Sequence, residues 1–331
     1  MSERLSPTGV AAIWAAALVV LAVVAVSVIV LVNQKVFGPV QMVKELQSHL
    51  VKGEGARALG LLNAKVPAGN ALLLDGEGLV AATADIKDFT VGKPEEILGA
   101  EDTVKVVATY SIHGVEQQTT YQLRHTGRSW MFFDDWEFVP TTLPTVAISA
   151  NTTNEVVVNS RRAPLVKGQA TVPVFVPAVI DTSFETPNFM ADSRGLAVTD
   201  FAKKGTDVKL QTQPTKKLMD EVNKQITAYL DGCAKQQVLM PAGCPMSYST
   251  SARVQSDSIH WSILDYPAAE VVSFDGGWAL RPLTVKARLE LTEQDLRTGG
   301  YTEQTVDDSF GFTAALKANT TKVLVTPVSS E

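Results

Sequence analysis

The feature that most constrains this chain is an apolar run of 23 residues, from Val10 to Val32, in which Ser27 is the most polar side chain. At about 1.5 Å per residue, a helix of this length is about 35 Å long, enough for a hydrocarbon core of about 30 Å. A soluble helix normally keeps one polar face, and this run has none. It therefore predicts an N-terminal transmembrane helix over residues 10–33, after a cytoplasmic tail over residues 1–9.

A cleaved secretory signal is the main alternative for this run. Such a signal has a shorter apolar core, and a small-x-small cleavage site follows it, which the segment from Ser27 to Lys35 does not contain. The basic residues after the run, Lys35 and Lys44 among them, favour a cytoplasmic body, whereas the cysteine pattern favours export. We expect a single-pass protein of the cell membrane with a cytoplasmic N-terminus and an extracytoplasmic body.

Two cysteines, Cys233 and Cys244, are the only ones in the 331 residues. Pro241, Gly243 and Pro245 lie around the second one and predict a turn that returns it to the preceding helix. A disulfide here would close a loop of about a dozen residues and contribute about 3 kcal/mol to stability. The pair predicts a structural disulfide and an oxidising compartment, with two reduced, buried cysteines as the alternative.

Composition and missing motifs exclude several classes of protein. The formal net charge is −6 without a concentrated basic face, which argues against a nucleic-acid partner. No C-x-x-C pair is present and no histidine lies close to the cysteines, so we expect no metal site. The sequence also lacks H-E-x-x-H, G-x-S-x-G and the phosphate-binding glycine motifs, so we expect no cofactor and no catalytic residues.

Helical and strand patterns divide the rest of the chain into three regions. Residues 36–139 begin with an amphipathic helix, in which Val40, Val43, Leu46 and Leu50 recur at helical spacing, and a second short helix. Four strand-like segments follow as an antiparallel meander: Ile86 to Val91, Thr103 to Ile112, Gln117 to His125, and Ser129 to Val139. Helices followed by such a sheet predict an α+β domain over residues 36–139.

Prolines break residues 140–213 into short apolar runs, which predict a small β-rich module with strands that include Val172 to Ile180. Residues 214–331 begin with a helix whose apolar stripe runs from Leu218 to Leu230 and ends at the cysteine loop. Predicted strands follow at Ser247 to Val254, Ile259 to Leu264, Ala269 to Phe274, and Trp278 to Leu291, and a polar loop holds Asp307 and Asp308. This region predicts a second α+β domain with a disulfide loop, and the fold class as a whole is α+β.

Two segments carry a resemblance to a known family. The phrase Lys52-Gly-Glu-Gly-Ala-Arg-Ala-Leu-Gly-Leu-Leu62 and the strand His125-Thr-Gly-Arg-Ser-Trp-Met-Phe-Phe-Asp-Asp-Trp136 resemble a nuclear-transport-factor-two-like domain over residues 36–139. The resemblance implies a cone of helices against a bent sheet. The whole chain also resembles single-pass extracytoplasmic proteins of actinobacteria that carry a Cys…Pro-x-Gly-Cys-Pro loop, which implies a location and no reaction.

Three candidate ligand-binding residues follow from the cone-like domain: Tyr110, His113 and Asp134. Some enzymes on this fold use an Asp or His inside the cone, and strand alternation points one of Asp134 and Asp135 inward. Because one fold hosts many functions, three classes stay open. We expect a non-enzymatic envelope protein that binds other envelope proteins or cell-wall components; a carrier or sensor of small apolar ligands and a cavity enzyme are the alternatives.

Overall fold

The computed structural model describes residues 7–32, 37–129, 133–202 and 206–328 of the chain. Strands hold 47% of the residues and helices 23%, so the fold is mostly β. The predicted α+β class is therefore wrong for the chain as a whole. The excess of strand comes from segments that the sequence patterns placed in loops or did not detect, above all a long hairpin near the C-terminus.

The predicted N-terminal helix is present as α1, Pro7–Val32. Among the described residues, however, none of the helices combines the length and the apolar character that a bilayer crossing needs. This finding contradicts the predicted transmembrane helix over residues 10–33, the single-pass membrane placement with its extracytoplasmic body, and the transmembrane part of the predicted fold class. Residues 1–6 of the predicted tail lie outside the described residues.

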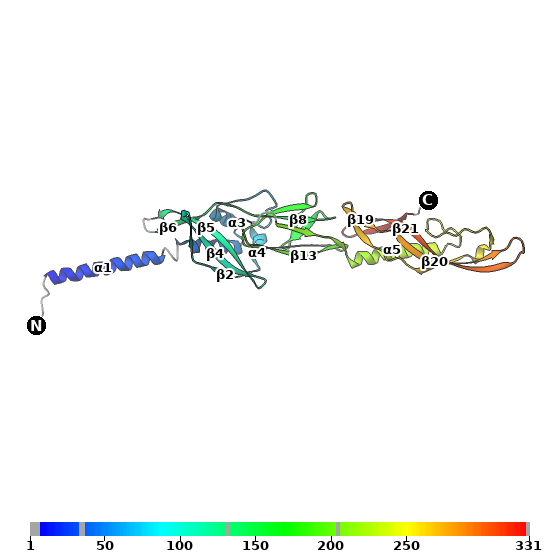
Figure 1. Cartoon of the computed structure of the whole chain (residues 1–331), viewed down its shortest axis with the longest axis horizontal. Coiled ribbons are helices and arrows are strands. Elements are labelled where there is room, and N and C mark those ends of the chain that lie inside the picture. The colour runs from blue at the N-terminus through cyan, green and yellow to red at the C-terminus, as the bar shows by residue number, and fades with distance from the viewer. Residues whose placement is uncertain (1–6, 33–36, 130–132, 203–205, 329–331) are drawn as a thin grey trace.

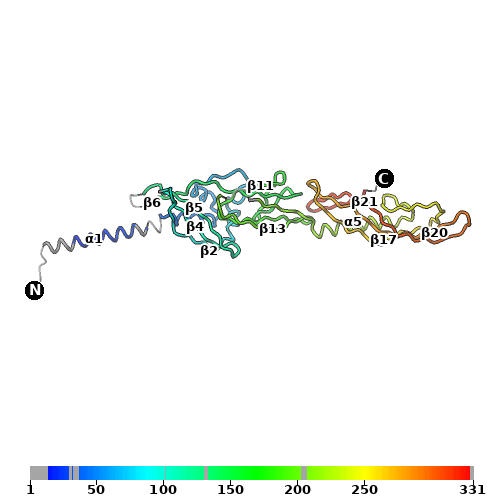
Figure 2. The backbone as a smooth tube through the Cα atoms, in the orientation of Figure 1, coloured from blue at the N-terminus to red at the C-terminus, as the bar shows by residue number. Residues whose placement is uncertain are grey.

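The chain forms an elongated rod, with α1 extending from one end (Figure 1). Three modules follow one another along its axis, and the tube in Figure 2 shows that the order along the rod is the order of the sequence. We call them the N-terminal module (residues 37–143), the middle module (residues 144–215) and the C-terminal module (residues 216–328). The long hairpin of the C-terminal module, within residues 283–318, forms the end of the rod opposite α1.

The N-terminal module packs three helices against a bent antiparallel sheet. The helices are α2 (Pro39–Val51), α3 (Gly55–Leu62) and α4 (Gly76–Thr83). The sheet has the order β2-β4-β5-β6, with β3 also on β4, and contains β2 (Ile86–Val91), β3 (Glu95–Ile97), β4 (Ala100–Ile112), β5 (Val115–Ser129) and β6 (Phe133–Phe138). A short parallel pair, β1 (Ala64–Lys65) and β7 (Thr141–Thr142), closes the module. Helices α2 and α3 lie where the sequence predicted them, whereas α4 was not predicted.

Close backbone packing places α3 beside the loop before α4. A Cβ atom on Gly55 would lie 1.7 Å from the Leu74 carbonyl oxygen, so only glycine fits at the start of α3. The Gly55 N–H donates to the Asp75 carboxylate at 2.8 Å, and Asp75 precedes the first residue of α4. The two short helices are therefore positioned by each other, which helix propensity alone does not reveal.

The middle module consists of two sheets around a shared apolar core. One sheet has the order β10-β9-β12-β13-β15 and the other β11-β8-β14. The strands are β8 (Thr145–Ala150), β9 (Glu155–Val158), β10 (Arg161–Pro164), β11 (Gln169–Pro173), β12 (Ala178–Glu185), β13 (Phe189–Val198), β14 (Thr206–Leu210) and β15 (Gln213–Pro214). The single strand expected from Val172 to Ile180 is wrong, because β11 ends at Pro173 and β12 begins at Ala178 in the other sheet.

The C-terminal module packs one long helix, α5 (Lys216–Ala234), against an antiparallel sheet. The sheet has the order β16-β20-β21-β22, with β17 also on β20, and a separate hairpin pairs β18 with β19. The strands are β16 (Arg253–Val254), β17 (His260–Asp265), β18 (Val271–Phe274), β19 (Gly277–Leu280), β20 (Leu283–Gln294), β21 (Tyr301–Ala318) and β22 (Val323–Val328). Asp307 and Asp308 lie on β21, so the polar loop predicted there is wrong.

The edge strand β22 is protected against pairing with another chain. The Gln225 side chain on α5 accepts from the Val325 N–H at 2.9 Å and donates to the Val323 carbonyl at 3.3 Å. Two residues further on, Pro327 has no N–H to offer. Because free edge groups are templates for aggregation, these two features favour a sheet that ends at β22.

Candidate functional site

The interior of the N-terminal module, where a cone-like domain would hold a ligand, is filled by apolar side chains. Its buried cluster joins α2, α3 and α4 to the sheet and includes Leu46, Leu62, Val106, Leu123 and Phe138. None of these five side chains is more than 2% exposed. Buried apolar side chains therefore occupy this interior, and a hollow of about 360 Å³ beside it is lined by Leu62, Tyr121, Phe138 and Phe201 among others.

One residue of this core comes from the middle module. Phe175 lies in the four residues between β11 and β12, is 1% exposed, and belongs to the cluster of the N-terminal module. Beside it, the Tyr121 hydroxyl on β5 donates to the Val176 carbonyl at 3.0 Å. The Tyr121 ring also meets Phe201 of the middle module edge to face, with centroids 5.8 Å apart. Burial raises the pKa of the Tyr121 phenol far above its ordinary range, so this hydroxyl keeps its proton.

Tyr110, one of the predicted ligand-binding residues, takes part in the same junction. It is 1% exposed, and its hydroxyl lies 2.7 Å from the Thr119 hydroxyl, which donates to the Thr199 carbonyl of the middle module. Burial raises the pKa of Tyr110. The ring also belongs to a small apolar cluster with Val179 of β12. These contacts give Tyr110 a structural position between the two modules.

The structure does not bring the three predicted residues together. His113 has a φ of +50° in the exposed turn between β4 and β5, with its Nε2 3.6 Å from a carboxylate oxygen of Asp85. Tyr110 pairs with Gln117 of β5, whereas Asp134 pairs with Arg128, eleven residues further along the same strand. At about 3.3 Å per residue, the two sites are roughly 35 Å apart. A shared ligand for the three residues therefore has no geometric basis.

Asp134 instead joins a small polar group at the far end of β5 and β6. Its carboxylate lies 2.9 Å from the Arg128 guanidinium and 3.4 Å from Nε2 of His125. His125 meets Trp136 edge to face, with centroids 5.2 Å apart. The His125 and Asp134 side chains are 29% and 30% exposed, so the pair lies at the rim of the core and not inside it. Sequence reasoning missed this pairing, because a bulge in β5 shifts the register between His125 and Gly127.

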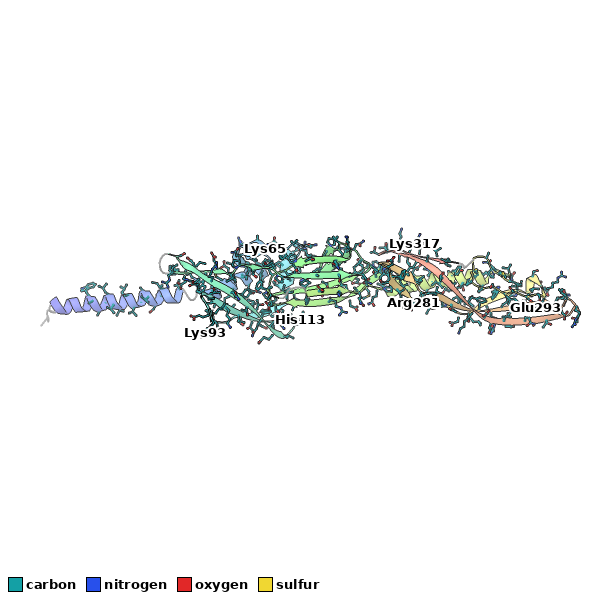
Figure 3. All side chains as sticks on the ribbon, turned by 45° about the horizontal axis from the view of Figure 1, so that its top comes forward. Lys65, Lys93, His113, Arg281, Glu293 and Lys317 are labelled. Carbon is teal, nitrogen blue, oxygen red and sulfur yellow. A yellow bond between two sulfur atoms is a disulfide. The ribbon has the colours of Figure 1, made fainter. Side chains whose placement is uncertain are left out.

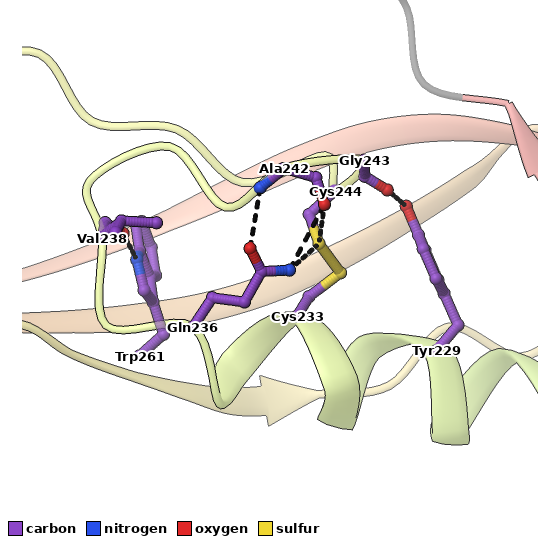
Figure 4. The surroundings of a disulfide bond; sticks show 8 residues. All are labelled: Tyr229, Cys233, Gln236, Val238, Ala242, Gly243, Cys244 and Trp261. Atoms are coloured by element: carbon purple, nitrogen blue, oxygen red, sulfur yellow. Dashed lines mark hydrogen bonds between the residues drawn. A yellow bond between two sulfur atoms is a disulfide. The ribbon is translucent and has the colours of Figure 1, made fainter.

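The predicted disulfide between Cys233 and Cys244 is confirmed, with an S–S distance of 1.99 Å. It joins the end of α5 to the long loop before β16 (Figure 4). Around it, the Tyr229 hydroxyl donates to the Gly243 carbonyl at 2.7 Å, and the Trp261 indole donates to the Val238 carbonyl at 2.9 Å. The loop therefore covers the apolar face of β17 and β20, as part of a cluster that includes Met246 and Leu289.

Aromatic stacking joins the middle and C-terminal modules. The Phe189 ring on β13 lies parallel to the Trp278 ring on β19, with centroids 4.6 Å apart and an angle of 8°. The buried amide of Asn188 donates to the Asn319 carbonyl at 2.8 Å across the same junction. Trp278 lines two hollows beside these contacts, of about 660 Å³ and about 300 Å³, and Thr152 and Asn319 line both as well.

No protein-family model, curated protein or solved structure matches this chain. The resemblance of residues 36–139 to the nuclear-transport-factor-two-like fold and the resemblance of the whole chain to actinobacterial proteins both stay predictions. Within the described ranges, no group of three or more His, Cys, Asp and Glu side chains could hold a metal ion.

The hydrogen bond of Tyr121 gives a direct test of the first junction. We expect Tyr121→Phe to lower the free energy of unfolding by about 1–2 kcal/mol, because the buried Val176 carbonyl would lose its side-chain donor. Urea unfolding followed by circular dichroism would measure the change. Tyr301→Phe is the matched control, since Tyr301 is 63% exposed, and it should change stability by less than about 0.5 kcal/mol. Equal effects of the two variants would contradict a structural role for the Tyr121 hydroxyl.

Proposed function

We propose that this chain is a non-enzymatic structural and interaction module: a rigid rod that holds its two ends at a fixed separation. The observation that carries the proposal is the continuity of the apolar cores across both junctions. At the first junction, Phe175 of the middle module lies in the core of the N-terminal module. At the second, one buried cluster joins Ile148 of the middle module to Val222 of α5 and Val285 of β20.

Continuous cores oppose bending between modules. A hinge between domains needs a linker with few contacts, and relative motion is the default where the interface is small and polar. Here the first junction has backbone contacts as well, since the Asn70 N–H donates to the Thr171 carbonyl at 2.8 Å. A Cβ on the neighbouring Gly69 would lie 2.6 Å from that carbonyl oxygen, so the two backbone segments are packed in direct contact. Bending would expose apolar surface to water, and this exposure costs a free energy of about 25 cal/mol per Å².

The filled interior of the N-terminal module supports a non-enzymatic role over the carrier and the cavity enzyme. Each alternative needs a volume in which a ligand is enclosed, and the side chains of Leu46, Phe138 and Phe175 occupy the place where the cone would hold one. Two histidine–carboxylate pairs among the described residues resemble an acid–base arrangement: His49 with Glu54 at 2.5 Å, and His125 with Asp134 at 3.4 Å. Neither pair belongs to the buried apolar cluster, and an arginine shares each carboxylate, Arg57 that of Glu54 and Arg128 that of Asp134.

Distances between spin labels would test the rigid rod. The only two cysteines form the disulfide, so introduced cysteines can be labelled selectively under non-reducing conditions. Glu116→Cys with Asp192→Cys spans the first junction, and Asp192→Cys with Lys286→Cys spans the second; all three positions are exposed on strands. We expect one narrow distance distribution for each pair. A broad or two-peaked distribution for either pair would overturn the proposal.

A further inference from the structure

A group of lysines lies beside the second junction. Lys217 and Lys224 on α5, with Lys322 in the turn between β21 and β22, line a hollow of about 800 Å³. Lys317 and Lys322 line the larger of the two hollows beside Trp278. Because Lys322 and Val323 line both hollows, the lysine group and the aromatic ring belong to one continuous surface, near the labelled Lys317 in Figure 3.

The lysines of this surface outnumber the carboxylates that line the same hollows. In the part of the chain that the structure describes, neither Lys217 and Lys224 nor Lys317 and Lys322 make an ion pair, and all four are exposed.

Two acidic residues, Asp220 and Glu221, line the same hollow as the lysines. Asp220 pairs with Lys216 at 2.6 Å, and the Glu221 carboxylate accepts from the neutral Gln225 amide at 3.0 Å. The hollow thus holds four lysines, Lys216 included, against two carboxylates. Glu155, beside the smaller hollow, pairs with Arg162 at 2.9 Å. A local excess of positive charge in a chain of net charge −6 attracts an anionic partner to this place and not to the surface at large.

Trp278 gives the surface an apolar element with a fixed orientation. Its ring is stacked on Phe189, and this contact favours one orientation of the indole plane. Thr152, Thr153 and Asn154, which carry hydroxyl and amide groups, line the smaller hollow together with Glu155. An aromatic plane beside hydroxyl and amide groups suits a sugar ring, which offers C–H groups on its faces and hydroxyls at its rim.

We propose that the second junction binds an anionic saccharide, whose rings contact Trp278 and whose acidic groups pair with Lys217, Lys224, Lys317 and Lys322. The inference rests on the proposed function, because it names the partner of an interaction module. Single-stranded nucleic acid fits less well, since successive bases need successive exposed rings and Phe189 is only 5% exposed. A partner that binds through charge alone would not need the Trp278 ring or the amide groups beside it.

Binding of the full chain to polygalacturonate would test the proposal, with biolayer interferometry as the measurement. We expect saturable binding that weakens about ten-fold in Lys317→Ala/Lys322→Ala and in Lys217→Ala/Lys224→Ala, because each variant removes two contacts with anions. Lys65→Ala/Lys93→Ala removes the same charge from the N-terminal module, far from the junction in Figure 3, and should change binding less than two-fold. An equal loss in this control, or no binding to polygalacturonate, would overturn the proposal.

Three further probes separate the chemical classes. Dextran supplies sugar rings without charge, polyphosphate supplies charge without rings, and oligothymidylate supplies both charge and bases. Weaker binding of all three supports the anionic saccharide, whereas binding as tight as that of polygalacturonate by any of them overturns it. Trp278→Phe keeps a ring against Phe189, and we expect it to weaken the binding of polygalacturonate several-fold while leaving the binding of polyphosphate unchanged. Unchanged binding of polygalacturonate would count against the ring contact. The spin-label distances do not depend on these results, so the rod can stand if the saccharide site fails.

Discussion

The substitution Phe175→Ala is expected to lower the free energy of unfolding by about 3–5 kcal/mol, the usual cost of removing a fully buried phenylalanine ring. Phe175 is 1% exposed and lies among the apolar side chains of a module to which it does not belong in sequence. Its removal would leave a cavity where α2, α3 and the sheet meet the middle module. Because the ring joins two modules, the loss should affect both.

Urea unfolding and spin-label distances would measure the two effects. The midpoint should fall in Phe175→Ala, and the narrow distance distribution between positions 116 and 192 should broaden. Phe274→Ala is the control, because Phe274 is 71% exposed and its loss should cost less than about 0.5 kcal/mol. A loss of under 1 kcal/mol in Phe175→Ala would show that the cores of the two modules are independent.

The position of Phe175 also explains why sequence patterns failed in this region. A continuous apolar run from Val172 to Ile180 is typical of a buried strand, and nothing local marks its break. In the structure Val172 and Ile180 belong to different sheets. Between them Phe175 enters the core of the N-terminal module, whereas Val174 and Val176 stay in the core of the middle module. Hydrophobic periodicity indicates which residues are buried, but it does not indicate which module's core they enter.

Patterns succeeded where one element buries one face against its own module. The stripe of α5 places Leu218, Val222, Ile226 and Leu230 in the core, and β2 has the bounds that its sequence predicted. The single strand expected from Trp278 to Leu291 is wrong, because β19 ends at Leu280 and β20 begins at Leu283. Pro282 marks this break and was visible in the sequence. Of the strand expected from Ser247 to Val254, only the last two residues pair with β20.

Polar residues misled the prediction for β21. Asp307 lies on the solvent face of the hairpin, where its carboxylate accepts two bonds from the Arg288 guanidinium, at 2.7 and 2.8 Å. This contact lowers the pKa of Asp307 and raises that of Arg288. A strand with one face in water needs apolar residues only at alternate positions, and Phe310, Phe312 and Ala314 supply them. The run of polar residues around Asp307 and Asp308 concealed that alternation.

Local sequence patterns did not reveal the candidate binding surface, for a different reason. Its lysines come from two segments almost a hundred residues apart, and Trp278 comes from a third. The absence of a basic run in the sequence therefore did not exclude a basic surface in the fold. The candidates Tyr110, His113 and Asp134 were chosen from a single region, and the register of β5 separates them.

The second large effect expected is that of the disulfide. Replacing Cys233 and Cys244 together by alanine should lower the free energy of unfolding by about 3 kcal/mol, because the unfolded chain would regain the freedom of a loop of about a dozen residues. The loss should be local. The loop from residue 235 to residue 252 has no strand or helix of its own, and its described anchors include the Tyr229 and Trp261 side chains.

Hydrogen exchange read by mass spectrometry would locate this effect, alongside urea unfolding. Exchange should accelerate in residues 235–258 and in β17, which the loop covers, and stay unchanged in the middle module. Reduction of the native chain by dithiothreitol is the matched control, since it opens the same loop with no change in sequence. An unchanged midpoint in both experiments would show that Trp261 and Met246 hold the loop without the bridge. Faster exchange in the middle module would instead extend the role of the bridge along α5 to the second junction, where Leu218 and Val222 share its core.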